Sequence, residues 1–436
     1  MKTLSAFLTI FLFSTGLFAQ TFVQHYYKVL PGLGTKSQAQ AIILTQDNNL
    51  FIAGPNNSSS ASGNMYYMKT DTAGNVIQTT FSDPLFNDTR QTACRLMEDA
   101  NSNFLMMGEY SYYHKTYFTR LSSAGVPLST HVNGGQFNFQ GGSDMVPMQD
   151  AGFLVASGFE VYNVDRALAL RKLDTDGNFI WDTILTYPTP SSPKIYGNFD
   201  RMASIDDSTV VITGTRDYTS GSFQDLDMFL MKIRFWNDSV KILQFKIIEK
   251  PGTNEHGYDV LVLPNNQGYI VCGDGANDNN NNYFDGIITR LDMAGNVVWK
   301  KTYTRAVNSY NRFMRVRLDN NGDIIVLART NGGSDDVTLL KYSLNGVQLE
   351  VAFFDLNLQN ETAFDMAIGP DNKIYVSAGT LYFGNEVKSL LLCVGNGTPA
   401  SSPTVPVSDW ALIMGILMIT IFMVVIYRKR RAVIDN

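Results

Sequence analysis

The sequence predicts an all-β protein: a seven-bladed β-propeller closed by an N-terminal strand, followed by a C-terminal transmembrane helix. Two observations predict the propeller. A glycine-containing turn recurs about every 50 to 60 residues along most of the chain, close to the period of a propeller blade. The segments between these turns are short and rich in β-branched and aromatic residues, and residues 20 to 395 show no sustained helical period.

The recurring turn is clearest in two copies, "LDTDGNFIWDTILTY" (173–187) and "LDMAGNVVWKKTY" (291–303). "RFWNDSVKILQF" (234–245) takes the place of a copy that lacks the glycine. The turn glycines are Gly74, Gly125, Gly177, Gly295 and Gly346. A second turn lies upstream of each copy, in segments such as "EDANSN", "PNNQG" and "LDNNG", and a β-rich run follows it. Seven such turn-plus-strand pairs predict seven blades.

Each repeat is interpreted as four antiparallel strands, a to d. In the third repeat these are "GSDMVPM", "GFLVASGF", "ALALRKLD" and "FIWDTILTY", with Asx and Gly turns between a and b and between c and d. The seventh repeat supplies strands a, b and c only. The segment "FVQHYYKVL" (22–30) precedes the first repeat and is expected to supply the missing strand, so that no blade leaves an open sheet edge.

The amino-acid sequence of the repeats resembles the delta-60 and related secreted bacterial propeller repeats over most of residues 22–394. The matching positions are mainly turn and core residues. The resemblance therefore implies a propeller fold and secretion, and it carries no catalytic residues.

The N-terminus has the three parts of a secretory signal: Lys2, an apolar run, and Ala19 as the small residue before a cleavage site. Residues 1–19 are expected to be removed, so that the mature chain begins at Gln20. The three cysteines, Cys94, Cys272 and Cys393, are too scattered for a disulfide framework and are expected to be buried thiols. The net charge of −6, with both signs interspersed, argues against a nucleic-acid partner.

The C-terminus predicts a membrane segment. A Pro/Ser/Thr linker (396–409) leads to the apolar run 410–427, which is long enough to span a bilayer, and a basic tail (428–436) ends the chain. The cations that follow the span are Arg428, Lys429, Arg430 and Arg431. They place the chain end in the cytoplasm and the propeller outside, by the positive-inside rule.

This tail also resembles the PEP-CTERM sorting signals recognised by exosortases, and especially the branch with an Ile-Pro-Thr-Leu motif before a tryptophan. The motif positions are Pro406, Ser408, Asp409 and Trp410, with Val407 in place of the threonine. The resemblance implies that an exosortase-type enzyme cuts the chain near the motif. The alternative is a plain single-pass anchor.

The b–c loops and the d–a connections are expected on one face of the propeller. All the long variable segments fall there: 55–64, 187–198, 216–227 and 273–286. Loops on a rigid scaffold commonly bind partners, so this face is predicted to engage an extracellular glycan or protein. The alternative is that these loops are surface insertions without function.

Few residues in the sequence indicate a metal, cofactor or catalytic site. Calcium is considered for 174–178 and 274–286, but neither has the full EF-hand spacing, and turn geometry explains the first. No cofactor is otherwise expected, and the histidines, His25, His114, His131 and His256, show no metal-ligand spacing. The spacing of Trp181 and Trp299 is similar to the tryptophan-docking repeats of quinoprotein dehydrogenases, but packing between blades is the preferred interpretation. We therefore predict a non-catalytic binding or surface-structure module without assigned catalytic residues. The alternative is a hydrolase or lyase of extracellular polymer.

Overall fold

The computed structural model divides the chain into two compact units, Gln24–Asn396 and a second composed of Met1–Val23 and Gly397–Asn436. The structure describes residues 22–396 with gaps at 32, 34–35, 58–62, 82–90, 100, 111–114, 134–138, 149–151, 162–164, 186–193, 218–225, 237–238, 249–253, 277–282, 307–308, 332–334, 357–359 and 383–385. Within these residues there is no helix of sufficient length and apolarity to span a membrane. The predicted signal peptide, sorting motif, membrane segment and basic tail lie outside the described residues.

The described part of the chain is built of antiparallel strands and one short 3-10 helix, η1 (Pro264–Asn266). Blade 1 consists of β3 (Ala41–Leu44), β4 (Leu50–Asn57), β5 (Gly63–Thr70) and β6 (Val76–Phe81). Blade 2 consists of β7 (Gln91–Glu98), β8 (Phe104–Tyr110), β9 (Lys115–Leu121) and β10 (Pro127–Asn133). Blade 3 consists of β11 (Phe139–Pro147), β12 (Phe153–Val161), β13 (Asp165–Leu173) and β14 (Phe179–Leu185). Blades 4 and 5 are β15 (Lys194–Asp206), β16 (Thr209–Asp217), β17 (Leu226–Trp236), β18 (Ser239–Ile248); and β19 (Glu255–Val262), β20 (Tyr269–Ala276), β21 (Phe284–Leu291), β22 (Val297–Tyr303). Blades 6 and 7 are β23 (Asn311–Leu318), β24 (Ile324–Asn331), β25 (Asp335–Tyr342), β26 (Gln348–Phe354); and β27 (Glu361–Ile368), β28 (Ile374–Tyr382), β29 (Glu386–Asn396), with β1 (Phe22–Val29) as the fourth strand.

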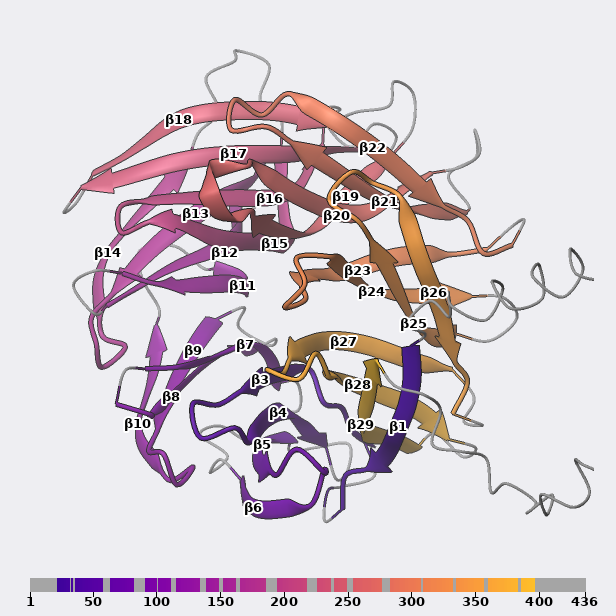
Figure 1. Cartoon of the computed structure of the whole chain (residues 1–436). Helices are drawn as coiled ribbons and strands as arrows, with labels where there is room; N and C mark the ends of the chain where they lie inside the picture. The colour runs from indigo at the N-terminus through magenta and orange to yellow at the C-terminus, as the bar shows by residue number, and fades with distance from the viewer. Residues whose placement is uncertain are drawn as a thin grey trace, which may run out of the picture. The chain divides into compact units, whose positions relative to one another are not determined.

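These seven blades form a closed ring (Figure 1). Each strand a contacts strand a of the next blade, and β27 of blade 7 contacts β3 of blade 1. The N-terminal strand β1 pairs with β29, and the short strand β2 (Lys36–Ser37) joins β29 to β4 in one continuous sheet. The predicted seven-bladed propeller and its closure by the N-terminal strand are therefore confirmed.

The recurring turn is a c–d hairpin held by one aspartate. Asp174 Oδ1 accepts hydrogen bonds from the backbone N–H groups of Asp176 (2.9 Å) and Asn178 (2.8 Å), and Oδ2 accepts from the Asn178 side chain (2.9 Å). Gly177 has a φ of +87°, which a side chain would strain. Asp176 instead pairs with Arg120, at 2.6 Å. The carboxylates that suggested calcium at 174–178 thus already have turn and inter-blade partners.

The same turn predicts how stability depends on pH. At Asp71 and Asp292, bonds from Asn75 and Asn296 hold the carboxyl pKa below its ordinary value. At Asp174, burial acts to raise the pKa, but the bonds from Asn178 outweigh it and the pKa is again lowered. A carboxyl whose pKa is lowered by folding adds stability above its unfolded pKa of about 3.9 and loses it as the pH falls through the folded value.

We therefore expect the urea concentration at the midpoint of unfolding to decrease when the pH is lowered from 7 to 3. Two other hairpins provide a matched control, because Ser122 and Ser343 accept the equivalent backbone bonds with a hydroxyl that does not titrate in this range. In a chain carrying Asp71→Ser, Asp174→Ser and Asp292→Ser, the midpoint urea concentration should decrease less between pH 7 and pH 3 than in the unaltered chain. An equal loss in both chains would show that these turns do not carry the effect.

Side chains of strand d connect each blade to the next c–d turn. Trp299 donates from Nε1 to the Leu344 carbonyl oxygen of blade 6 at 3.0 Å, and a Cβ on Gly346 would lie 2.8 Å from its ring. Tyr26 of β1 makes the equivalent bond to the Thr72 carbonyl oxygen of blade 1, at 2.8 Å. Trp181 packs against the core between blades 3 and 4. The prediction that these tryptophans are inter-blade core residues is confirmed.

Charged side chains of alternating sign join the strands a around the ring. They are Arg95, Asp144, Arg201, Asp259, Arg315 and Asp365, one from each of blades 2 to 7. We call these six residues the charge ring. Each follows a β-bulge in strand a, which is a common device for re-aiming a side chain. Seven blades cannot alternate completely, and blade 1 has the apolar Ala41 in this place.

The charge ring is largely buried, and each of its members has an ion-pair partner. Asp259 accepts from Arg317 Nη1 at 2.7 Å and from the backbone N–H of Val316 at 2.9 Å. Burial acts to raise the pKa of Asp259, but the cationic Arg317, Arg315 and Arg201 outweigh it and lower the pKa. The other ion pairs are Arg95–Asp144 (3.0 Å), Arg201–Asp144 (3.5 Å), Arg315–Asp365 (3.3 Å) and Arg317–Asp365 (3.6 Å). The innermost strands are thus connected by charge as well as by apolar packing.

Two cysteines, Cys272 and Cys393, are buried free thiols, as predicted. Burial raises the pKa of Cys393 to about 12, so that it stays protonated at neutral pH. The side chain of Cys94 lies outside the described residues.

Candidate functional site

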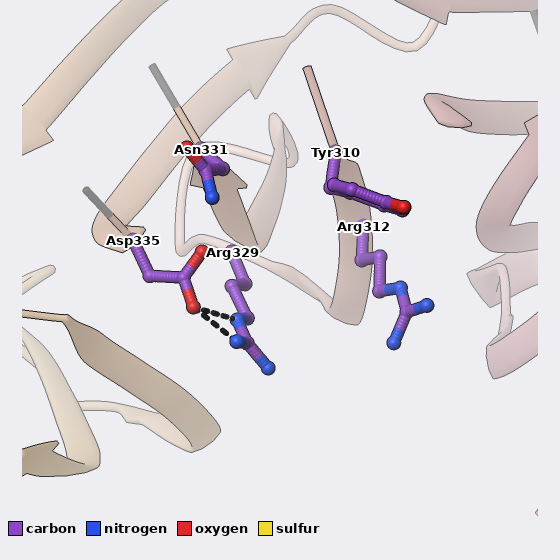
Figure 2. Close-up of a pocket in the computed structure, with 5 residues that line it drawn as sticks. All are labelled: Tyr310, Arg312, Arg329, Asn331 and Asp335. Atoms are coloured by element: carbon purple, nitrogen blue, oxygen red, sulfur yellow. Dashed lines mark hydrogen bonds and ion pairs between the residues drawn. The ribbon is translucent and has the colours of Figure 1, made fainter. Parts of the chain in front are cut away.

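A pocket of about 290 Å³ opens at the b–c end of blade 6, on the face where the sequence predicted binding. Its lining residues come from the start of β23 and the residue just before it, the end of β24 and the start of β25 (Figure 2). They are Tyr310, Arg312, Arg329, Asn331 and Asp335. Rigid strand ends, rather than loop tips, therefore position these side chains.

The two arginines are placed together by strand register. Arg312 of β23 lies directly opposite Arg329 of β24. Like charges in this arrangement repel, and each arginine is accompanied by a carboxylate that offsets the repulsion. Arg329 Nε donates to Asp335 Oδ2 at 2.8 Å, and Arg312 Nε lies 3.1 Å from Asp274 Oδ2 of blade 5. The carboxylates fix the direction of both guanidinium groups.

Blade 5 contributes a second cross-strand pair beside the pocket. His256 of β19 lies opposite Asp274 of β20, and its Nδ1 is 2.6 Å from Asp274 Oδ1. Tyr258 donates its hydroxyl to the other oxygen of Asp274 at 3.0 Å. Burial and the neighbouring Asp274 raise the pKa of Tyr258 well above its ordinary value, so the phenol remains a donor. Asp274 thus holds an imidazole, a phenol and a guanidinium in fixed positions.

Aromatic rings form one wall of this region. Tyr310 is 42% exposed and stacks on Phe284 of blade 5, with 6.0 Å between ring centroids. Phe284 in turn lies 5.5 Å from the His256 ring, and the Arg312 guanidinium sits over it at 5.9 Å. The exposed part of the Tyr310 ring can pack against a ligand.

Chemically, this arrangement combines fixed cations, an aromatic surface and both kinds of hydrogen-bonding group. The guanidinium groups donate, the Asp335 carboxylate accepts, and the Asn331 side chain can do both. Such a small set of fixed polar groups beside an aromatic wall is typical of a ligand-binding pocket.

The expected long loops are shorter than the sequence suggested. Strand β4 continues to Asn57, β15 begins at Lys194, β16 continues to Asp217, and β20 and β21 take in Gly273–Ala276 and Phe284–Gly286. Backbone pairing across the blade overrides the Asn- and Gly-rich composition of these ends. As a result, Asp274 is a buried strand residue with three side-chain partners rather than an open oxygen ligand in a calcium loop.

The structure does not test the site residues named from the sequence. Ala19, Gln20, Pro406, Ser408, Asp409, Trp410 and Arg428, Lys429, Arg430 and Arg431 all lie outside the described residues. His25, His131 and His256 lie in strands, as expected, and His114 is outside the described residues.

Within the described residues, one group of three acidic side chains is close enough to share an ion: Asp336, Asp355 and Glu361. The Arg305 guanidinium already pairs with Asp336. This group was not predicted from the sequence, and it includes no residue of either segment considered for calcium.

Sequence reasoning missed the pocket because its charges lie on different strands. One signal was present: His256 and Arg312 each stand three residues before a charge-ring residue, Asp259 and Arg315. Aligning the repeats on strand a would have shown that blades 5 and 6 carry titratable side chains at the same position.

The fold and pocket define this chain as a seven-bladed β-propeller with a polar pocket at its b–c end. Similar solved structures include the C-terminal WD40 domain of Sif2 (9% identity, 84% of this chain and 99% of that one, TM-score 0.45). A quinohemoprotein alcohol dehydrogenase from Comamonas testosteroni is also similar (9% identity, 88% of this chain and 78% of that one, TM-score 0.48). So is a protein of unknown function from Dyadobacter fermentans (8% identity, 86% of this chain and 99% of that one, TM-score 0.45). At these identities the likeness concerns the fold alone. No protein-family model and no curated protein matches the chain.

Proposed function

We propose that this chain is an exported β-propeller that acts as a non-catalytic binding module for an extracellular glycan or protein. The observation that carries the proposal is the pocket at Tyr310, Arg312, Arg329, Asn331 and Asp335. Its polar groups are oriented in advance by carboxylates and stand on paired strands, which lowers the entropy lost on binding.

The sequence supports the export and anchoring part of the proposal. We assign residues 1–19 as a signal peptide, 20–395 as the delta-60-like propeller, 396–409 as linker and sorting motif, 410–427 as a membrane span and 428–436 as a cytoplasmic tail. The PEP-CTERM-like motif favours processing by an exosortase-type enzyme. Fractionation with intact-mass analysis of the native protein tests this assignment, and a mature chain that retains residues 1–19 or stays in the cytoplasm contradicts it.

Binding at the pocket is tested with the variant Tyr310→Ala/Asn331→Ala. We expect it to bind intact producer cells at least about tenfold more weakly than the unaltered chain, because both side chains line the pocket. Ile77→Ser, at an exposed residue of a c–d hairpin, serves as the control and should bind normally. Equal binding by all three chains would exclude the pocket as the binding site.

One observation favours the alternative of a polymer-cleaving enzyme. The contact between His256 Nδ1 and the accepting Asp274 carboxylate orients the imidazole and directs Nε2 toward a second partner, as in a general base. Cleavage of extracellular polysaccharide that is lost in His256→Gln would favour the enzyme, whereas binding without cleavage favours the module.

A further inference from the structure

We propose that the pocket takes a uronic acid residue of an acidic polysaccharide, with Arg312 and Arg329 binding its carboxylate and Tyr310 packing against its ring. This inference rests on the proposed function, because it names the ligand class for the same pocket.

The guanidinium groups provide the carboxylate site. Figure 2 shows both extending in the same direction from neighbouring strands. Asp335 engages Nε and Nη2 of Arg329, and Asp274 engages Nε of Arg312. Among the described residues, Nη1 of Arg329 and both Nη atoms of Arg312 have no other partner. Fixed guanidinium donors of this kind match the planar geometry of a carboxylate.

The other pocket groups favour a sugar over a simple polyanion. Asp335 places a carboxylate in the wall, which would repel a ligand that carried only negative charge but accepts hydrogen bonds from hydroxyl groups. Asn331 lines the pocket with a polar amide, and the exposed part of the Tyr310 ring suits the apolar face of a pyranose ring. A uronic acid is a ligand that combines a carboxylate, hydroxyl groups and an apolar ring face.

The dimensions agree with one residue of a polymer. At about 290 Å³ the pocket lies at the lower limit of ligand pockets, which span about 300–1,000 Å³. The remainder of a polysaccharide chain would continue across the b–c end of the blade.

The test measures binding of the mature full chain to polygalacturonate, to its fully methyl-esterified form, and to polyglutamate as a polymer with carboxylates but no sugar. We expect binding to polygalacturonate alone. Arg312→Lys/Arg329→Lys keeps the charge but removes the fork, and it should weaken binding by about ten- to a hundredfold. Arg120→Lys, at an arginine that pairs with Asp99 and Asp176, should bind normally, and thermal unfolding of each variant establishes that it folds.

Each other outcome overturns the inference in a distinguishable way. Equal binding to the methyl ester excludes the carboxylate, and equal binding to polyglutamate points to an acidic peptide instead. Binding that is unchanged in the double lysine variant places the ligand elsewhere. If the chain does not bind polygalacturonate but still binds producer cells in a Tyr310-dependent manner, the proposed ligand class is wrong and the proposed binding function is retained. If the chain binds neither, the proposed function is also wrong.

Discussion

Replacing Asp259 by alanine is expected to lower the free energy of unfolding by about 3–5 kcal/mol. Asp259 is buried in the charge ring and accepts from Arg317 Nη1 and the backbone N–H of Val316. Its removal leaves Arg317 and the nearby Arg315 and Arg201 with less negative charge in a region that excludes most water. The cost is that of uncompensated buried cations, which greatly exceeds the net value of a single ion pair.

Chemical denaturation of the single variant measures this loss of unfolding free energy, and two further variants serve as controls. Asp371→Ala removes an exposed partner of Lys373 and should change stability by less than about 1 kcal/mol. Combining Asp259→Leu and Asp365→Leu with Arg315→Met and Arg317→Met removes two charges of each sign together, because Asp365 pairs with the same two arginines. This variant should recover much of the loss, since buried ion pairs can often be replaced by apolar side chains. An Asp259→Ala variant as stable as the unaltered chain would mean that the charge ring is not needed.

Deleting residues 22–29 is expected to cost at least about 5 kcal/mol, through lost strand hydrogen bonds and lost apolar burial. This segment is β1, the fourth strand of blade 7. It also links blade 7 to blade 1, because Tyr26 donates to the Thr72 carbonyl oxygen and Lys28 Nζ donates to Asn75 Oδ1, both at 2.8 Å. Without β1, the edge of β29 is exposed and the ring loses one of its closing contacts.

The deletion is measured by urea unfolding and by size-exclusion chromatography, since an exposed edge strand also promotes self-association. Adding a peptide with the sequence "FVQHYYKVL" should restore stability, and a scrambled peptide should not. Tyr26→Phe, which removes only the hydroxyl, should cost about 0.5–1.5 kcal/mol. A truncated chain that unfolds at the original urea concentration would contradict closure by β1.

Several features of the fold were readable from the sequence because they depend on local chemistry. The Asp-x-x-Gly-Asn pattern at 174–178 makes a c–d hairpin through bonds within five residues. Such turns, together with the turn-plus-strand pairs upstream of them, count the blades. The incomplete seventh repeat and the preceding "FVQHYYKVL" likewise predict the closing strand. Loop lengths were less accurate, since Asp274 lies in an Asn- and Gly-rich segment that strand pairing nevertheless orders.

The sequence by itself determined an all-β chain of seven repeated blades, closed by its own N-terminal strand. Only the tertiary structure decided which charges meet. Asp259 and Arg317 are 58 residues apart in the chain, and Arg312 finds Asp274 on a neighbouring blade. These contacts depend on bulges and strand register, which aim individual side chains between blades and leave little trace in the pattern of apolar residues. The repeat therefore predicts the scaffold, whereas the pocket and the charge ring arise from how neighbouring blades pack.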